Sequence, residues 1–210
     1  MRLFYTVGSP FARVVRIALQ ETGLDERVTK QEIPRERLYS PESDVLAINP
    51  VGRIPTLALE DGTVLTESKL ILDFIDTMSP DHKLLPRDGS DGWRTLSEMG
   101  QAVGLLDGII TWMRALHQPP SLGAQDVIAK EAIRAHRTVD ALEIAVADGA
   151  FAGPINAAQI VLGTALGLVE VRMPSWRWRE GHPHLSAWYD KIAARLSFRS
   201  TVPPPFDKPL

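Results

Sequence analysis

The chain contains no cysteine. Without thiols it can form no disulfide, bind no metal through thiolates and use no cysteine nucleophile. It also has no apolar run long enough to cross a membrane, and Met1–Tyr5 do not begin the apolar core and small-residue cleavage site of a secretory leader. We therefore expect a cytoplasmic protein that does not enter a membrane.

Basic residues are not in excess either. The 23 Lys and Arg residues are outnumbered by 26 Asp and Glu residues, which gives a formal charge of -3. No run rich in Lys and Arg appears, so we expect neither nucleic acid nor anionic lipid as a partner. The five histidines show no ligand spacing, and His182-Pro183-His184 is better explained as a surface loop than as a metal site. No metal is expected.

What the chain does contain suits a folded globular protein. Its 210 residues are 44% hydrophobic, enough for one large or two small domains. Up to residue 78 the residue patterns alternate between those of strands and helices, in the order β-α-β-α-β-β-α. The expected elements are a strand at 2–6, a helix from Pro10 to Gly23, a strand at 27–33, a short helix at 41–48, strands at 56–59 and from Val64, and a helix at 67–78.

The most informative stretch runs from Asn49 to Ser68. It reads Asn49-Pro50-Val51-Gly52-Arg53-Ile54-Pro55-Thr56-Leu57, then a hairpin turn at Asp61-Gly62, then Glu67-Ser68 at a helix start. Pro55 has no N–H to donate, which suits the first residue of a strand. If its peptide bond is cis, the backbone of Ile54 faces outward and can pair with an extended ligand.

This stretch resembles the glutathione-binding half of a bacterial-type glutathione S-transferase, in which N-P-x-G-[KR]-[IV]-P-x-L, a D-G hairpin and E-S before a helix follow one another. The resemblance implies the glutathione transferase fold, with an α+β thioredoxin-like domain over residues 1–78. It also implies glutathione as a co-substrate. It is strongest over residues 1–80, moderate around residues 150–170 and weak in the C-terminal tail.

The second half of the chain is expected to be all-helical. Residues 79–92 are rich in Pro, Asp, Gly and Ser and are interpreted as a linker. Asn156 and Gln159 fit a capping box, although the family usually has Ser or Thr and Asp there. The expected helices lie at 93–117, 125–146, 157–171 and 184–195, within a domain of residues 93–210 that would contribute the electrophile site.

Two hydroxyl groups are candidates for the catalytic role. Ser9-Pro10-Phe11-Ala12 stands where redox-active relatives of the thioredoxin fold carry Cys-x-x-Cys, so thiol chemistry through the protein is excluded. Ser9 at a helix start can donate a hydrogen bond to a thiolate, as in serine-type transferases, or can simply cap its helix. Tyr5 is the alternative, as in tyrosine-type members, or a core residue.

The resemblance also assigns the residues that bind glutathione. Glu67 and Ser68 would hold the γ-glutamyl end, Ile54 before Pro55 would pair with the cysteinyl backbone, and Arg53 would meet the glycyl carboxylate. Arg53 can equally be a solvated surface cation, and Glu67 an ordinary acid at a helix start. Arg13 is a weaker candidate.

The electrophile pocket is less well marked. Trp112 and Met113 belong to an apolar stripe on the first long helix, and such stripes usually form core. They are candidates for lining a pocket for a small hydrophobic electrophile, as are Phe11 and Phe198.

The resemblance favours a cytosolic glutathione transferase that conjugates the glutathione thiolate to an electrophilic small molecule. Two alternatives share the fold: a non-catalytic binding or regulatory protein, and a glutathione-dependent isomerase or dehalogenase. A two-fold homodimer is expected from the resemblance and from the usual symmetry of soluble oligomers.

Overall fold

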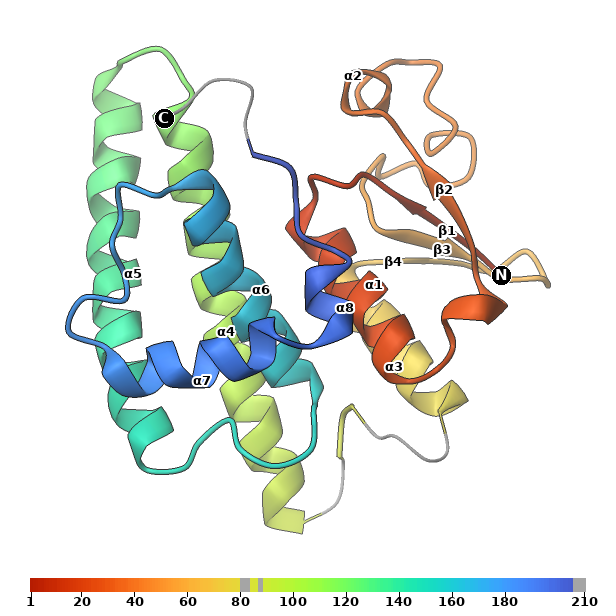
Figure 1. Cartoon of the computed structure of the whole chain (residues 1–210). Helices are drawn as coiled ribbons and strands as arrows, with labels where there is room; N and C mark the ends of the chain where they lie inside the picture. Colours follow the sequence, from red (N-terminus) through yellow and green to blue (C-terminus); the bar gives the residue numbers. More distant parts are fainter. Residues whose placement is uncertain (80–83, 87–88, 206–210) are drawn as a thin grey trace. The chain divides into compact units, whose positions relative to one another are not determined.

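A computed structural model describes residues 1–79, 84–86 and 89–205. The chain divides into two compact units (Figure 1). The first takes Met1–Leu85 and, from the far end of the sequence, Ser200–Pro204, and the second takes Pro86–Arg199 and Pro205. The chain therefore leaves the first unit once and returns to it.

The first unit is built on a four-stranded sheet in the order β2-β1-β3-β4. Strand β1 pairs parallel with β2 and antiparallel with β3, which pairs antiparallel with β4. The expected order of elements and the mixed pairing are both confirmed. The elements are β1 (Arg2–Tyr5), α1 (Pro10–Glu21), η1 (Asp25–Arg27), β2 (Thr29–Glu32), α2 (Arg35–Leu38), β3 (Thr56–Ala58), β4 (Val64–Thr66) and α3 (Ser68–Met78).

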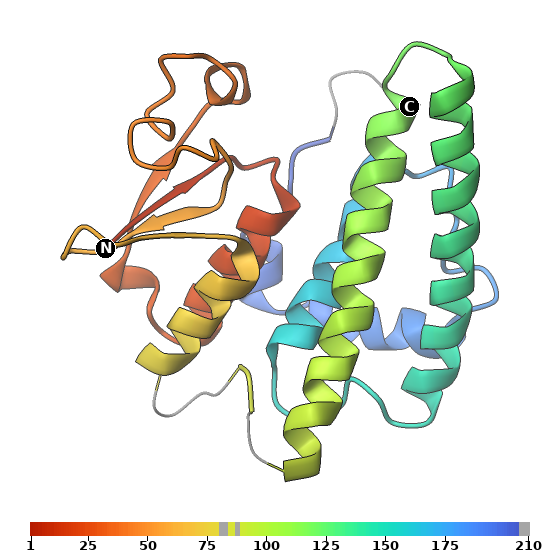
Figure 2. The same ribbon diagram turned by 180° about the vertical axis from the view of Figure 1, so that it is seen from behind.

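Both faces of this sheet are covered. Side chains alternate along a strand, so Leu3 and Phe4 point to opposite faces, and both are buried. Helices α1 and α3 pack together on one face, whereas α2 and the loop after it lie on the other (Figures 1 and 2). On that second face Phe4 joins a cluster with Ile33, Leu38 and Val45.

One expected helix is misplaced. Residues 41–48 form successive turns, and the helix in this region, α2, lies at Arg35–Leu38 instead. The Ser40 hydroxyl accepts a hydrogen bond from the N–H of Glu42, two residues on, which is the geometry of a turn rather than of a helix cap. Ser40-Pro41-Glu42 therefore does not begin a helix.

The second unit is helical, as expected. Helix α4 packs against α5 and α6, and α7 contacts α5 and α6. Asn156 and Gln159 form the predicted capping box at the start of α6. Helix α4 begins at Gly89, inside the predicted linker, of which residues 80–83 and 87–88 lie outside the described part. The helices are α4 (Gly89–Leu116), α5 (Leu122–Ala147), α6 (Ala157–Arg172), α7 (Pro183–Ala193) and α8 (Leu196–Arg199).

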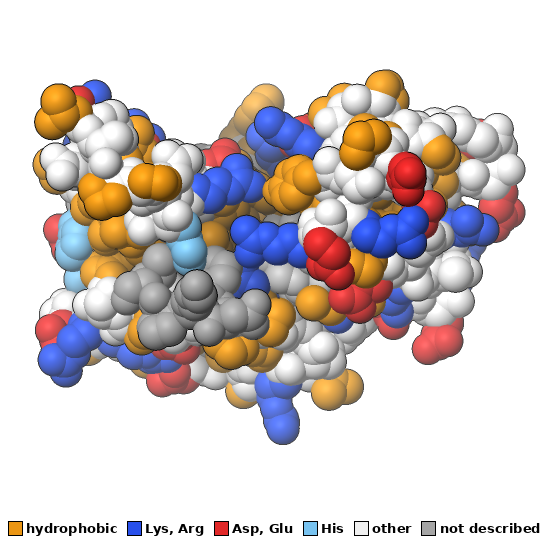
Figure 3. All heavy atoms as spheres, turned by 90° about the horizontal axis from the view of Figure 1, so that it is seen from above, with side chains coloured by type: hydrophobic (Ala, Val, Ile, Leu, Met, Phe, Trp, Pro, Cys, Tyr) orange, Lys and Arg blue, Asp and Glu red, His pale blue; other side chains and the backbone are white. Residues whose placement is uncertain are grey.

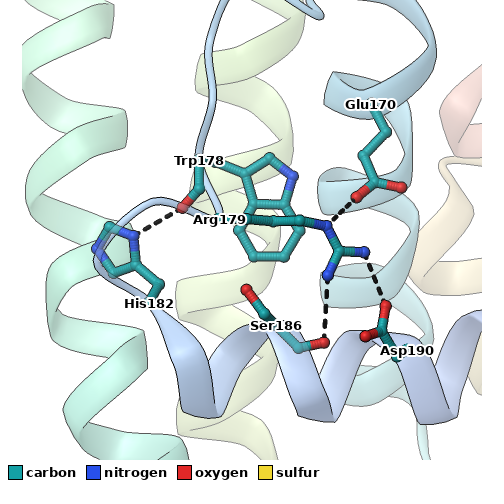
Figure 4. Close-up of polar contacts among 6 residues, drawn as sticks. All are labelled: Glu170, Trp178, Arg179, His182, Ser186 and Asp190. Carbon is teal, nitrogen blue, oxygen red and sulfur yellow. Dashed lines mark hydrogen bonds and ion pairs between the residues drawn. The ribbon is translucent and has the colours of Figure 1, made fainter.

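Arg179 joins α6 to α7 (Figure 4). Its Nε lies 2.5 Å from Glu170 Oε1 on α6, and its Nη2 lies 2.8 Å from Asp190 Oδ1 on α7. The guanidinium also stacks over the rings of Trp178, at 4.9 Å, and Tyr189, at 5.1 Å. Planar stacking and forked hydrogen bonding together are specific to Arg, so the contact fixes the loop between these helices.

The segment Ser200–Pro204 is attached to α1 by polar contacts. Thr201 is buried, and its Oγ1 accepts a hydrogen bond of 3.3 Å from Nε of Arg13, which is itself only 3% exposed. The Ser200 hydroxyl donates to Gln20 at 3.0 Å. These contacts explain why residues late in the sequence belong to the first unit.

The surface carries charges of both signs. In Figure 3 basic and acidic side chains are interspersed with apolar ones. Several large apolar side chains are exposed, including Leu70 on α3 and Trp93 on α4. Among the described helices, none is both long enough and apolar enough to span a bilayer.

Candidate functional site

Three segments far apart in the sequence meet at one edge of the sheet. In the register, Phe4 pairs with Thr56, and Thr56 pairs with Thr66. The end of β1, the start of β3 and the end of β4 are therefore neighbours. The residues just beyond these strand ends are Thr6–Ser9, Arg53–Pro55 and Glu67–Ser68, so the topology brings together the loops that hold the predicted catalytic and glutathione-binding residues.

Ser9 caps helix α1. Its Oγ accepts a hydrogen bond of 3.3 Å from the N–H of Ala12, and Pro10 occupies the first helical turn, where its missing N–H costs nothing. In the described part of the chain the hydroxyl proton of Ser9 has no acceptor. Because a hydroxyl can accept and donate at once, Ser9 can cap the helix and still donate to a group placed at its N-terminus.

Tyr5 ends β1 and is half-buried. Its ring lies under the guanidinium of Arg16, 4.8 Å from the ring centroid. Arg16 is seven residues beyond Ser9 on α1, about 10 Å along the helix axis. The ring thus packs against the side of α1, although its hydroxyl has no hydrogen-bond partner among the described residues.

The loop before β3 leaves backbone groups available. The Ile54–Pro55 peptide bond is cis, Pro55 is buried and Ile54 is half-buried. Neither the N–H nor the C=O of Ile54 bonds to another described residue. The Arg53 side chain is exposed and forms no ion pair within the described segments. This loop therefore offers one donor, one acceptor and one cation.

The start of α3 has the character of an anion site. Glu67 is its N-cap, with a φ of 68° that non-glycine residues rarely adopt, and its carboxylate does not cap the helix. The Glu67 carbonyl accepts from Leu70 and Ile71, whereas the N–H groups of Ser68 and Lys69 and the Ser68 hydroxyl bond to no described residue. Free N–H groups at the positive end of an 11-residue helix favour a bound carboxylate.

The exposed carboxylate of Glu67 is the complementary group. Strained backbone of this kind is found mainly where function requires a particular geometry. A negative side chain beside an anion site suits a ligand that carries an ammonium and a carboxylate on one carbon.

Sequence reasoning missed Asn49. In the sequence it is only the first residue of the N-P-x-G-[KR]-[IV]-P-x-L motif, yet Asn49 is 3% exposed and its side chain bonds to Val51, Arg53, Thr56 and Thr66. The available signal was an Asn before a turn, because Asn commonly bonds to backbone two residues on. Its long-range partners cannot be deduced from local sequence.

The electrophile candidates are distributed over both units. Phe11 lies half-buried on α1. Trp112 and Met113 are buried on α4, and Trp112 packs with Trp176, at a ring distance of 5.2 Å. Phe198 is buried too, beside Gly163 of α6. A cavity of about 420 Å³ within the helical unit is lined by other residues of α4 and α5, among them Gln101, Asp107 and Glu131.

The mixed four-stranded sheet and its helices define a thioredoxin-like domain, and an all-helical unit follows it in the sequence. A family model described as the glutathione S-transferase N-terminal domain matches residues 8–78, and one described as the C-terminal domain matches residues 125–191. Glutathione S-transferase 3 of Zea mays is 30% identical over 94% of this chain and 95% of its own length. The chain belongs to the glutathione S-transferase family.

Other relatives cover nearly the whole chain. The uncharacterized GST-like protein YibF of Escherichia coli K12 is 28% identical over 97% of this chain and 99% of its own. A glutathione transferase family member from Pseudomonas fluorescens Pf-5, solved with bound glutathione, is 34% identical over 97% of this chain and 98% of that chain, with a TM-score of 0.86.

Proposed function

We propose that this protein is a glutathione transferase that conjugates the thiolate of glutathione to a small hydrophobic electrophile. The observation that carries the proposal is a group of donors and acceptors at one edge of the sheet that bond to no described residue: the hydroxyl proton of Ser9, the backbone N–H and C=O of Ile54, and the first N–H groups of α3. A related structure that contains glutathione supports the same ligand.

In this proposal each part of glutathione meets a group of matching chemistry. The α-carboxylate of the γ-glutamyl end accepts bonds from Ser68 and from the N–H groups of α3, and Glu67 receives the ammonium. The cysteinyl backbone pairs with the N–H and C=O of Ile54, which precedes Pro55. The exposed guanidinium of Arg53 meets the glycyl carboxylate.

Ser9 then lies at the start of α1 to solvate the sulfur. Its hydroxyl donates a hydrogen bond to the thiolate, and the N-terminus of α1 adds favourable potential. Ser9 keeps its proton throughout, because it stabilises the anion rather than removing the thiol proton. The thiolate attacks the electrophile and displaces a leaving group or adds to a double bond. Phe11, Trp112 and Met113 are our candidates for contacts with the apolar part of the electrophile.

The test is binding to immobilised glutathione, followed by conjugation of a general aromatic electrophile. Glu67→Gln should weaken glutathione binding about tenfold or more, because a charged hydrogen bond is lost. Glu36→Gln, an exposed acid on α2 of the same unit, is the matched control and should leave binding unchanged.

Two results would redirect the proposal. No binding at millimolar glutathione contradicts it. Binding without turnover across many electrophiles favours a binding or regulatory role, and a glutathione-dependent substrate screen identifies an isomerase or dehalogenase instead.

A further inference from the structure

The side chain of Asn49 lies at the centre of a buried polar network. Its Oδ1 accepts a bond of 3.0 Å from the N–H of Val51. Its Nδ2 lies 2.8 Å from Thr56 Oγ1, 3.2 Å from the Arg53 carbonyl oxygen and 3.2 Å from Thr66 Oγ1. Asn49 is 3% exposed and Thr56 is fully buried, so water is excluded from most of this network.

The chemistry of the partners fixes the orientation of the amide. The Thr56 hydroxyl donates to the Arg53 carbonyl at 2.6 Å, so its oxygen faces Asn49 as an acceptor. The Asn49 Nδ2 therefore meets three oxygens, and its two protons are shared among them. A flipped amide would place its oxygen against those oxygens and its nitrogen against the N–H of Val51. Only the observed orientation satisfies the network.

The network connects the two halves of the candidate site. Arg53 directly precedes Ile54, which offers its backbone, and Thr66 directly precedes Glu67 and Ser68. The backbone ladder between β3 and β4 ends at the pair Thr56 and Thr66. Beyond that last pair, the Asn49 side chain bonds both to the loop before β3, at the Arg53 carbonyl oxygen, and to the end of β4, at the Thr66 hydroxyl.

We propose that Asn49 is a positioning residue that sets the spacing between the Ile54 backbone and the start of α3. This inference rests on the proposed glutathione site. According to this inference, Asn49 does not contact glutathione. It fixes the loop and the helix start at the separation at which one glutathione molecule engages both, so its loss lowers glutathione affinity in a protein that remains folded.

The first test compares Asn49→Ala with Asn156→Ala. The chain has only these two asparagines, and Asn156 caps α6 in the other unit, so its loss destabilises the unit that does not contain the candidate site. By titration calorimetry at a temperature where both variants are folded, Asn49→Ala should raise the Kd for glutathione at least about tenfold. Asn156→Ala should leave it within about twofold. Equal affinity in the two variants overturns the inference.

The second test uses the far end of the network and remains informative if Asn49→Ala fails to fold. Thr66→Val removes the hydroxyl and should weaken glutathione binding roughly three- to tenfold, whereas Thr66→Ser keeps it and should restore the affinity to within about twofold of the wild type. Amide hydrogen exchange at Leu70 and Ile71, which bond to the Glu67 carbonyl, should quicken in Thr66→Val alone.

The outcomes separate this inference from the proposed function. A wild type that does not bind glutathione removes both, and this is seen before any variant is made. A wild type that binds, with Thr66→Val binding equally well, overturns the positioning role and leaves the proposed function intact.

Discussion

A serine hydroxyl at a helix start is sufficient for the chemistry proposed for Ser9. A free thiol has a pKa of about 8.5, and each unit by which the pKa is lowered requires about 1.36 kcal/mol. One hydrogen bond to the anion and the positive end of α1 together reach that magnitude. Because Ser9 already caps α1 through its oxygen lone pair, its two functions use different parts of one hydroxyl group.

Ser9→Ala should raise the pKa of the bound glutathione thiol by roughly one to two units, equivalent to about 1.4 to 2.7 kcal/mol. The contact is made to the ionised form, so turnover should shift to higher pH while glutathione affinity changes far less. The thiolate absorbance of the complex measures the titration directly.

Tyr5→Phe is the matched control for this prediction. Since the Tyr5 ring packs under Arg16, removal of its hydroxyl should leave the thiol titration unmoved. If Tyr5→Phe shifts the titration and Ser9→Ala does not, Tyr5 is the donor. If Ser9→Ala lowers the folding stability but does not change the titration of the glutathione thiol, Ser9 only caps α1.

Among the helices and strands, the sequence predicts those whose ends and faces are marked by signals within a few neighbouring residues. The capping box of α6 and the helix after Ser9-Pro10 were found because caps, prolines and apolar periodicity lie within a few residues of each other. The prediction of a helix at 41–48 is wrong, because Ser40 can begin a turn as readily as a helix. The role of Asn49 depends on partners brought close by strand pairing, which no local pattern contains.

The start of α7 gives a prediction about pH. Glu143 on α5 accepts bonds from the N–H groups of His184, at 3.0 Å, and Leu185, at 2.7 Å. Desolvation acts to raise the pKa of Glu143, but the two backbone bonds, together with the nearby His184 and His182 side chains, outweigh it and hold the pKa below its ordinary value of 4.5. The stabilisation is therefore complete above about pH 4.5 and is lost as the pH falls through the lowered pKa.

Glu143→Gln should lower the free energy of unfolding at neutral pH by about 0.5 to 1 kcal/mol, because an uncharged cap is weaker at a helix N-terminus. The difference from the wild type should shrink in acid, where the native carboxylate is protonated. Urea unfolding at about pH 7 and about pH 3 measures both. A difference that is the same at the two pH values would contradict the assignment.

For the whole molecule, we predict a two-fold homodimer. Large apolar side chains are exposed on both units, with Leu70 at 59% and Trp93 at 74%, and such surface is commonly covered in symmetric oligomers. Static light scattering at micromolar concentration should give twice the chain mass of 23.2 kDa. A particle of the single-chain mass would refute the prediction.

The return of Ser200–Pro204 to the first unit has a consequence for synthesis on the ribosome. Domains are generally completed in the order in which they are translated. Here the contact between Arg13 and Thr201 cannot form until the intervening helical unit, Pro86–Arg199, has been translated. Until the helical unit has been translated, the nascent first unit therefore lacks the bond from Arg13 to Thr201, and a ribosome that stalls within that unit leaves this bond unformed.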